Sequence, residues 1–106
     1  SAAVAERVLL ARDRQRRRLA GSGWQTNSEV SGTYLRRHLP LPKGLQSVDE
    51  AVDRGRLSAR GVDKVLRLAW TIADLAGHDV PGRDELDIAL AMRRGEQPGA
   101  VRREAV

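Results

Sequence analysis

With 106 residues, 41% of them hydrophobic and 31% charged, the chain is long enough for one globular domain and too short for two of ordinary size. It contains no cysteine, which excludes disulfides, thiolate metal sites and cysteine nucleophiles. Its net charge is +5, and no apolar stretch approaches the ~20 residues of a transmembrane helix or forms the core of a signal peptide, so we expect a cytoplasmic domain without a membrane partner.

Apolar residues recur at helical spacing through nearly the whole chain, and no stretch alternates as a half-buried strand does. The first helix is predicted over about residues 3–20 and is ended by Gly21 and Gly23. A loop follows, and its Trp24 is expected to anchor it to the core. The predicted buried face of this helix consists of Val4, Val8, Ala11 and Leu19.

A second helix is predicted over about 28–38, with Asn27 or Ser28 as its N-cap. Pro40 and Pro42 then enforce an extended connection, because proline fixes its own backbone and restricts the residue before it. The face that the second helix is expected to bury consists of Val30, Tyr34 and Leu35.

Ser47 and Glu50 have the spacing of a capping box, in which each side chain binds the other residue's backbone N–H. This pattern predicts a short third helix over about 48–55. The fourth helix is the longest, and it is predicted over about 59–76 with Ser58 as its N-cap.

Gly77 stands where the C-terminus of the fourth helix favours a residue in the left-handed region. The last helix is predicted over about 82–94, with two acidic residues in its first turn, where the helix dipole favours negative charge. Residues 95–106 are expected to form a flexible C-terminal tail after a helical domain of residues 1–94. Five helices joined by short loops predict a small all-α bundle.

The fourth predicted helix has two faces. Its apolar stripe consists of Val62, Val65, Leu66, Ala69, Ile72, Ala73 and Ala76. Its polar face consists of Arg60, Asp63, Lys64, Arg67, Thr71 and Asp74, and Trp70 borders the two faces. In the ordinary interpretation the polar face is solvated and carries ion pairs such as Asp63 with Arg67. A sharper hypothesis concerns Arg60, whose guanidinium lies in the first turn, where open backbone N–H groups already favour an anion.

The positive charge is concentrated near the N-terminus. Residues 1–38 contain eight arginines and three acidic residues, a net charge of +5, whereas residues 39–106 contain eleven of each sign. This clustering is typical of a surface that faces a polyanion such as nucleic acid or nucleotide phosphates. The abundance of arginine as such is equally expected from the codon usage of a GC-rich genome.

No group of residues predicts catalysis or metal binding. His38 and His78 lie beside predicted helix ends, where a solvated role fits them better than that of a metal ligand or a base. The chain contains neither a phosphate-binding loop nor a dinucleotide-binding glycine motif. By itself the chain is therefore not expected to be an enzyme, and it has no predicted catalytic or metal-binding residue.

The segments Leu57–Gly61, Val65–Ala69 and Thr71–Leu75 resemble the C-terminal domain of magnesium-chelatase-like AAA+ ATPases, most closely the competence protein ComM type. Weaker matches lie in the first, second and last helices, at Ala11, Arg12, Gln15, Arg18, Asn27, Leu86, Ala89, Leu90 and Arg93. One residue departs from the pattern, because Trp70 stands where the family usually has arginine. Either this protein lacks a nucleotide or subunit contact there, or the packing has changed.

The resemblance implies that the domain is an AAA+ lid, joined to an upstream AAA+ core of the same chain and next to neighbouring subunits in a ring. It also implies that the full-length protein uses ATP with Mg²⁺ and that this fragment, which begins with Ser1, binds neither alone. The family's nucleotide-sensing arginine matches Arg60, which would report the γ-phosphate of ATP through movement of the lid. Further implied phosphate or subunit contacts are Arg12, Gln15, Arg18 and Arg67. ComM-type relatives are DNA-processing motors, which makes DNA a candidate partner.

Two other hypotheses remain open. The first is a free-standing arginine-rich helical module that binds nucleic acid through the arginine run of the first helix, which consists of Arg12, Arg14, Arg16, Arg17 and Arg18. These arginines spread around the helix, which suits phosphate contacts better than the reading of bases. The second hypothesis is a structural interaction domain that binds no ligand.

Overall fold

The computed structural model describes residues 1–95 and the side chains of residues 1–93. All regular elements in this part are helical, which confirms the predicted all-α fold. They are α1 (Ala2–Leu19), the 3₁₀ helix η1 (Asn27–Glu29), α2 (Gly32–Arg37), α3 (Leu45–Asp53), α4 (Ala59–Ala76) and α5 (Arg83–Gly95). The predicted tail lies outside the described residues, apart from Gly95, which is the last residue of α5.

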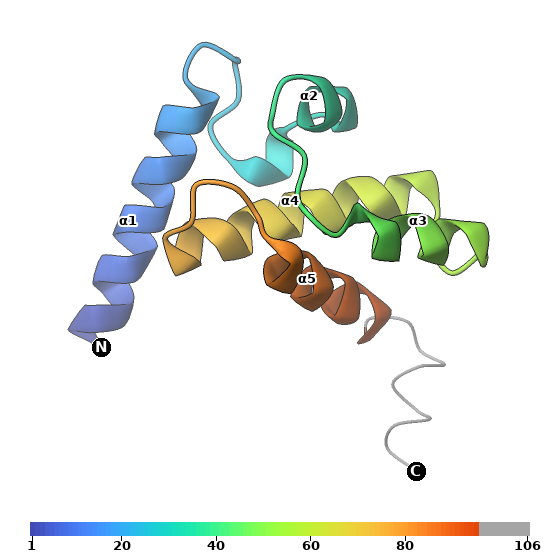
Figure 1. The fold of residues 1–106 in the computed structure, drawn as a ribbon. Helices are drawn as coiled ribbons and strands as arrows, with labels where there is room; N and C mark the ends of the chain where they lie inside the picture. The colour runs from blue at the N-terminus through green and yellow to red at the C-terminus, as the bar shows by residue number, and fades with distance from the viewer. Residues whose placement is uncertain (96–106) are drawn as a thin grey trace.

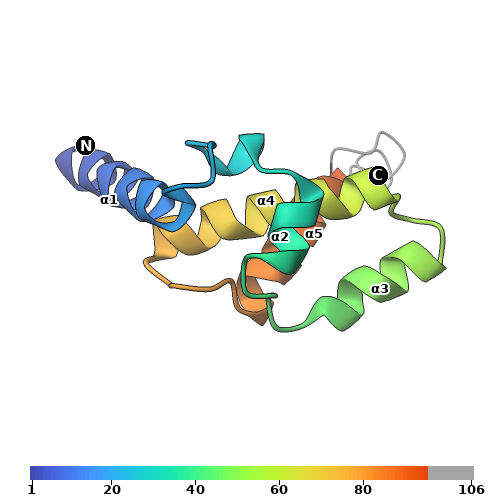
Figure 2. The same cartoon turned by 90° about the horizontal axis from the view of Figure 1, so that it is seen from above.

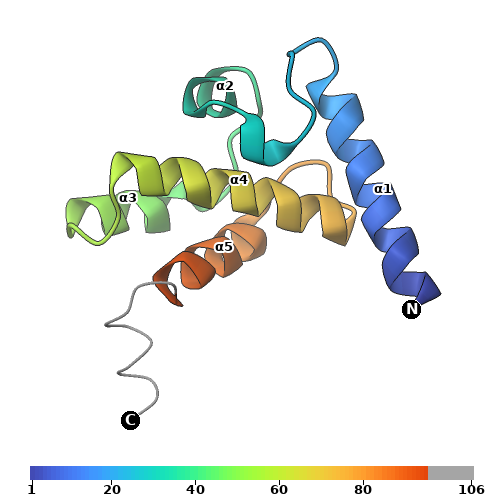
Figure 3. The same cartoon turned by 180° about the vertical axis from the view of Figure 1, so that it is seen from behind.

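The helix α4 runs through the middle of the bundle, and the other elements surround it. It packs against α1, η1, α2 and α5, whereas α3 packs against α5. Figure 1 shows α1 across one end of α4 and α3 near the other end, and Figure 2 shows the same order from above. From behind, in Figure 3, η1 and α2 lie on one side of α4 and α5 on the other. Within the described part of the chain, no helix combines the length and apolar character needed to cross a membrane.

The hydrophobic core lies around α4. Trp70 of α4 is the largest of the fully buried side chains, and Leu19, Leu35 and Leu86 are buried from other helices. Trp24 is half-buried and packs against this core, where its ring meets the ring of a tyrosine edge-on at a centroid distance of 5.2 Å. The predicted anchoring of the loop after α1 is therefore confirmed.

The helix α4 begins and ends where predicted, because the residues that fix its two ends act on neighbouring residues only. Ser58 Oγ accepts a hydrogen bond from the Gly61 N–H at 3.1 Å, and Gly77 follows the helix with a φ of 81°. Gly61 also permits a close approach, because a Cβ there would lie 2.7 Å from Leu57 Cδ1. The buried side chain of Leu57 therefore packs against the first turn of α4.

The predicted second helix is wrong, because the chain forms two short helices instead of one over 28–38. The 3₁₀ helix η1 ends at Glu29, and α2 begins at Gly32. Between them Val30 has extended backbone angles (φ −67°, ψ 134°) and is fully buried. In a continuous helix the orientation of the Val30 side chain would be set by the helical twist, whereas the extended backbone at this residue lets the side chain enter the core. Burial of Val30 is therefore the physical reason for the break.

The predicted N-caps of this region are also wrong. The cap of η1 is Thr26, and it forms a capping box with Glu29, whose carboxylate accepts from the Thr26 N–H at 3.0 Å. The cap of α2 is Ser31, whose Oγ accepts from a backbone N–H at 3.2 Å. Neither Asn27 nor Ser28 has the expected role, and Asn27 is buried.

The third helix begins earlier than predicted. It starts at Leu45, which is partly buried against the core, and its N-cap is Gly44 with a φ of 86°. Ser47 therefore lies inside the first turn, where its N–H donates to the Gly44 carbonyl at 3.2 Å. The capping box predicted for Ser47 and Glu50 is wrong, because packing of Leu45 moves the start of the helix by one turn.

The helix α1 buries less of its predicted apolar face than expected. Ala11 and Leu19 are buried, but Val8 is only half-buried and Val4 is 56% exposed. Figure 1 shows that α1 crosses the end of α4 and continues past it toward the N-terminus. The prediction for Val4 is wrong because no described element covers this end of α1.

Candidate functional site

The polar face predicted for α4 is only partly solvated, which corrects that interpretation: Arg60, Lys64 and Thr71 are exposed, whereas its other members pack against neighbouring elements. Asp63 pairs with Arg36 of α2 at 2.6 Å, and Arg67 Nε donates to the Val30 carbonyl at 2.7 Å. Asp74 is buried, with 4% of its surface exposed. The predicted ion pair between Asp63 and Arg67 does not form, because α1, η1 and α2 pack against α4 and supply other partners.

A polar cluster that we call the α1–α4 clamp joins α1, η1 and α4; it consists of Gln15, Arg18, Asn27, Thr71 and Asp74. Arg18 donates two hydrogen bonds of 2.6 Å to the Asp74 carboxylate and a third, of 2.8 Å, to Asn27 Oδ1. Asn27 donates to Asp74 at 3.0 Å and to Thr71 Oγ1 at 3.1 Å, and its backbone N–H donates to Gln15 Oε1. The side chains of Arg18 and Asp74 are 13% and 3% exposed, so loss of either charge would leave the other buried.

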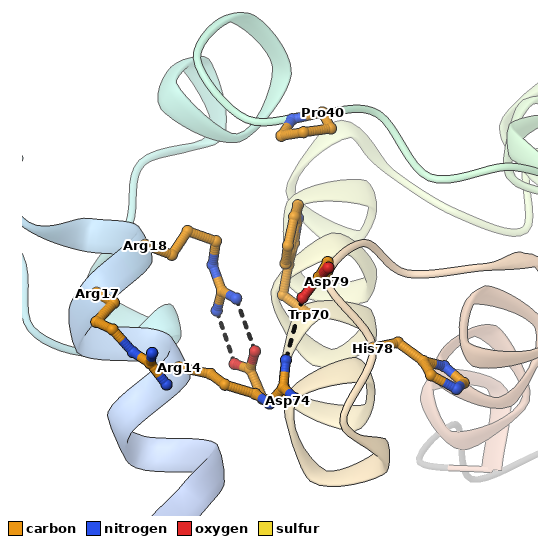
Figure 4. A pocket seen from close by; sticks show the side chains of 8 residues that line it. All are labelled: Arg14, Arg17, Arg18, Pro40, Trp70, Asp74, His78 and Asp79. Carbon is orange, nitrogen blue, oxygen red and sulfur yellow. Dashed lines mark hydrogen bonds and ion pairs between the residues drawn. The ribbon is translucent and has the colours of Figure 1, made fainter.

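A cavity of about 530 Å³ adjoins the clamp and is shown in Figure 4. Its lining residues are Arg14, Arg17, Arg18, Pro40, Trp70, Asp74, His78 and Asp79. The guanidinium of Arg18 lies over the Trp70 ring, 4.3 Å from its centroid, and Arg14 pairs with Asp79 at 3.1 Å. Two of the three cations in the cavity are therefore neutralised by carboxylates of the same cavity.

The arginine run of α1 is largely matched by carboxylates. Four of its five members have a partner: Asp79 for Arg14 at 3.1 Å, Asp13 for Arg16 and Arg17 at 3.9 Å and 2.7 Å, and Asp74 for Arg18 at 2.6 Å. Arg12 is exposed and has no hydrogen bond or ion pair with the described residues. Arg16 and Arg17 share one carboxylate and are 69% and 71% exposed, so they stay accessible to a polyanion together with Arg12. Only Arg14 and Arg18 of the run each have a carboxylate of their own.

Arg60 is exposed in the first turn of α4, and its guanidinium makes no hydrogen bond or ion pair within the described part of the chain. At a rise of 1.5 Å per residue, Arg60 lies ~21 Å along the helix axis from the clamp carboxylate. The predicted contacts Arg12, Gln15 and Arg18 thus lie at the opposite end of α4 from Arg60. A single phosphate group cannot touch both sets, and Arg67 lies midway between them.

The two histidines make local contacts near helix ends. His38 stacks on Tyr34 with a centroid distance of 5.0 Å. His78 donates through Nδ1 to Glu85 of α5, and this hydrogen bond lowers the pKa of Glu85 below its ordinary value even though burial of the carboxyl raises it. Among the residues that the structure describes, no three His, Asp or Glu side chains are grouped so that they could hold a metal ion.

Replacing Glu85 with glutamine is expected to flatten the acid dependence of stability. The folded-state pKa of Glu85 lies below its ordinary value of 4.5, so its carboxylate stabilises the fold fully above that value. This contribution is lost as the pH falls through the lower folded-state pKa. Denaturant unfolding from pH 7 to pH 3 should show a stability difference between wild type and Glu85→Gln that is constant near neutrality and narrows in acid.

The matched control for this experiment is Asp84→Asn, since Asp84 is the exposed neighbour in the same first turn of α5 and has no hydrogen bond or ion pair to a described residue. The free energy of unfolding of Asp84→Asn, plotted against pH, should run nearly parallel to that of wild type. A Glu85→Gln curve that also stays parallel down to pH 3 would show that the bond from His78 does not stabilise the fold.

Sequence reasoning missed the clamp. It placed Asp74 on a solvated face and gave Asn27 the role of a helix cap, whereas both are buried and bind each other. Both lie at positions that match the family pattern, and an aspartate inside an otherwise apolar motif was the available signal. The partner of Asp74 could not be identified from spacing, because Arg18 is 56 residues away in the sequence.

Comparison with known proteins identifies a family and several relatives. The model of the family described as magnesium chelatase, subunit ChlI C-terminal, matches residues 1–93. Uncharacterized proteins of Mycobacterium bovis and of two strains of Mycobacterium tuberculosis are 48% identical to the chain over 100 residues. The alignments cover 93% of this chain and 19% of each relative, so the chain spans about a fifth of the relatives' length. No solved structure matches the chain.

Proposed function

Because the chain belongs to the magnesium chelatase subunit ChlI C-terminal family, we propose that it is the helical lid of a longer AAA+ ATPase that uses ATP and Mg²⁺. In this proposal an AAA+ core lies upstream in the same chain, and neighbouring subunits form a ring. The proposal is supported by the family match over residues 1–93 and by the greater length of the relatives. In this proposal the core supplies most of the phosphate ligands, so we expect the lid alone not to hydrolyse ATP.

The observation that carries the proposal is that Arg60 is exposed and makes no hydrogen bond or ion pair with the described residues. Its guanidinium therefore has no carboxylate partner among the described residues, and Arg60 lies in the first turn of a helix that Ser58 caps. An always-charged planar donor in that position can bind a phosphate through paired hydrogen bonds. We assign Arg60 as the residue that contacts the ATP γ-phosphate, in its own subunit or in a neighbour, and loses this contact on hydrolysis.

The α1–α4 clamp would carry such a change through the domain. It fixes α1 to α4 through the bidentate bond between Arg18 and Asp74, so the two helices move together. A shift of Arg60 on release of the γ-phosphate would then move α1 as well, which is the helix nearest to any upstream domain. In this role Arg18 and Gln15 are positioning residues inside the lid and do not bind phosphate.

We further propose that the ATPase is a DNA-processing motor of the ComM type. This part of the proposal rests on the resemblance of the segments Leu57–Gly61 and Thr71–Leu75 to the ComM pattern. The competing function, a free-standing module that binds nucleic acid through α1, has less support. Two arginines of its run, Arg14 and Arg18, are each paired with a carboxylate of the same domain, and two others share Asp13.

Steady-state ATP hydrolysis by the full-length protein tests the assignment of Arg60. The Arg60→Ala variant is expected to turn over roughly 10- to 150-fold more slowly, because a charge-assisted hydrogen bond contributes about 1.5–3 kcal/mol. The control is Arg37→Ala, since Arg37 is an exposed arginine of α2 without a partner among the described residues. Normal turnover by Arg60→Ala would remove this residue from the mechanism.

A further inference from the structure

Asp63 lies between two arginines of its own helix and pairs with neither. Arg60 precedes it by three residues and Arg67 follows it by four, and both spacings bring side chains together on the surface of a helix. The Asp63 carboxylate instead binds Arg36 of α2, with 2.6 Å between its Oδ1 and the guanidinium. The two side chains of this ion pair are 24% and 46% exposed, so the pair lies at the edge of the contact between α2 and α4.

Two residues of α2 determine where the Asp63 carboxylate lies. Gly32, the first residue of α2, leaves the space for it, because a Cβ at this position would overlap the carboxylate. Arg36, one turn further along α2, supplies the opposite charge. The carboxylate therefore packs against α2 and does not lie along the surface of its own helix.

The arginines on either side of Asp63 differ in whether they are already bound. Arg67 donates its Nε–H to the Val30 carbonyl at 2.7 Å, which ties its guanidinium to the segment between η1 and α2. Arg60 is exposed and makes no hydrogen bond or ion pair with the described residues. If the carboxylate lost Arg36, the unbound guanidinium at pairing distance would be that of Arg60. Such a pair would occupy the donors that a phosphate needs.

We propose that Arg36 is a positioning residue for Arg60: by binding Asp63, it prevents an ion pair within α4 that would compete with the γ-phosphate. This inference rests on the proposed function and gives a role to a residue outside the phosphate contacts. Because the ion pair joins α2 to α4, the position of α2 determines how much of Arg60 is free. Ion pairs of this spacing stabilise a helix only weakly, so we expect an effect of about twofold.

Steady-state ATP hydrolysis by full-length variants tests this role. Arg36→Ala is expected to turn over about twofold more slowly than wild type, because Asp63 then binds part of the Arg60 population. The double variant Arg36→Ala with Asp63→Asn should regain the wild-type rate, since no carboxylate is left to compete. A merely structural ion pair predicts no such rescue, because the double variant lacks the pair as well. The matched control is Arg37→Ala, which removes the neighbouring exposed arginine of α2.

Calorimetric titration of the same variants separates this competition from a general effect on the nucleotide site. Arg36→Ala should bind a non-hydrolysable Mg-ATP analogue about twofold more weakly and Mg-ADP as wild type does, because only the γ-phosphate competes with Asp63. Asp63→Asn alone should bind both nucleotides with wild-type affinity.

Three results would overturn the inference and leave the proposed function standing, provided that Arg60→Ala is impaired. They are a wild-type rate of Arg36→Ala, a double variant that is as slow as Arg36→Ala, and an equal loss of affinity for Mg-ADP and the ATP analogue in Arg36→Ala. Normal turnover by Arg60→Ala would overturn the inference together with the proposed function.

Discussion

Replacing Asp74 with alanine is expected to lower the free energy of unfolding of this domain by about 3–5 kcal/mol. The side chain of Asp74 is 3% exposed, and it accepts both short hydrogen bonds from Arg18 and one from Asn27. Without the carboxylate, the Arg18 guanidinium would remain largely buried beside Trp70 with no opposite charge. Denaturant unfolding of the 106-residue chain, followed by circular dichroism, measures this loss.

A matched control is Asp63→Ala, which removes an aspartate from a more exposed ion pair of the same helix. Asp63→Ala is expected to lower the free energy of unfolding by less than about 1 kcal/mol, because partly solvated ion pairs contribute little to stability. A double variant, Arg18→Met with Asp74→Leu, should recover much of the stability, since it leaves neither charge buried alone. If Asp74→Ala lowers the free energy of unfolding as little as Asp63→Ala does, the clamp does not hold α1 to α4.

The second large effect is expected at Trp70, where alanine should lower the free energy of unfolding by about 3–5 kcal/mol. Trp70 is 1% exposed and is the largest fully buried side chain, so its loss opens a large cavity in the centre of the core. Trp70→Arg should be at least as harmful, because it would place a second guanidinium beside Arg18. Thermal and denaturant unfolding of the three chains give the comparison.

Trp24→Ala is the control for the Trp70 variants, because Trp24 is only half-buried at the edge of the core. Trp24→Ala is expected to lower the free energy of unfolding by less than Trp70→Ala does. A stable Trp70→Arg chain would contradict this account of the packing. It would mean that the tryptophan is interchangeable with the arginine that the resembled family usually has at this position.

The fourth helix shows what sequence can predict here. Ser58 and Gly77 are end signals that act through neighbouring residues only, and the bounds of α4 were therefore correct at both ends. Arg60 could be singled out for the same reason, since its place in the first turn follows from the cap. The packing of Trp24 against the core could be predicted because a tryptophan in a short glycine-flanked loop has few other places to be buried.

The failures arose where contacts distant in sequence decided the outcome. Capping patterns were present near Asn27 and at Ser47, but burial of Val30 and of Leu45 selected other starting points. The polar side of α4 looked fully solvated because an amphipathic pattern cannot reveal that neighbouring elements cover part of it. The long-range partner of Asp74 became visible only in three dimensions.

The central claim is that Arg60 touches the γ-phosphate of ATP, and the most direct test is a structure of the full-length protein bound to a non-hydrolysable ATP analogue with Mg²⁺. The account predicts a guanidinium nitrogen of Arg60 about 3 Å from a γ-phosphate oxygen, of the same subunit or of its neighbour. An Arg60 that lies in solvent or binds a protein carboxylate, with the γ-phosphate held entirely by other residues, would contradict it.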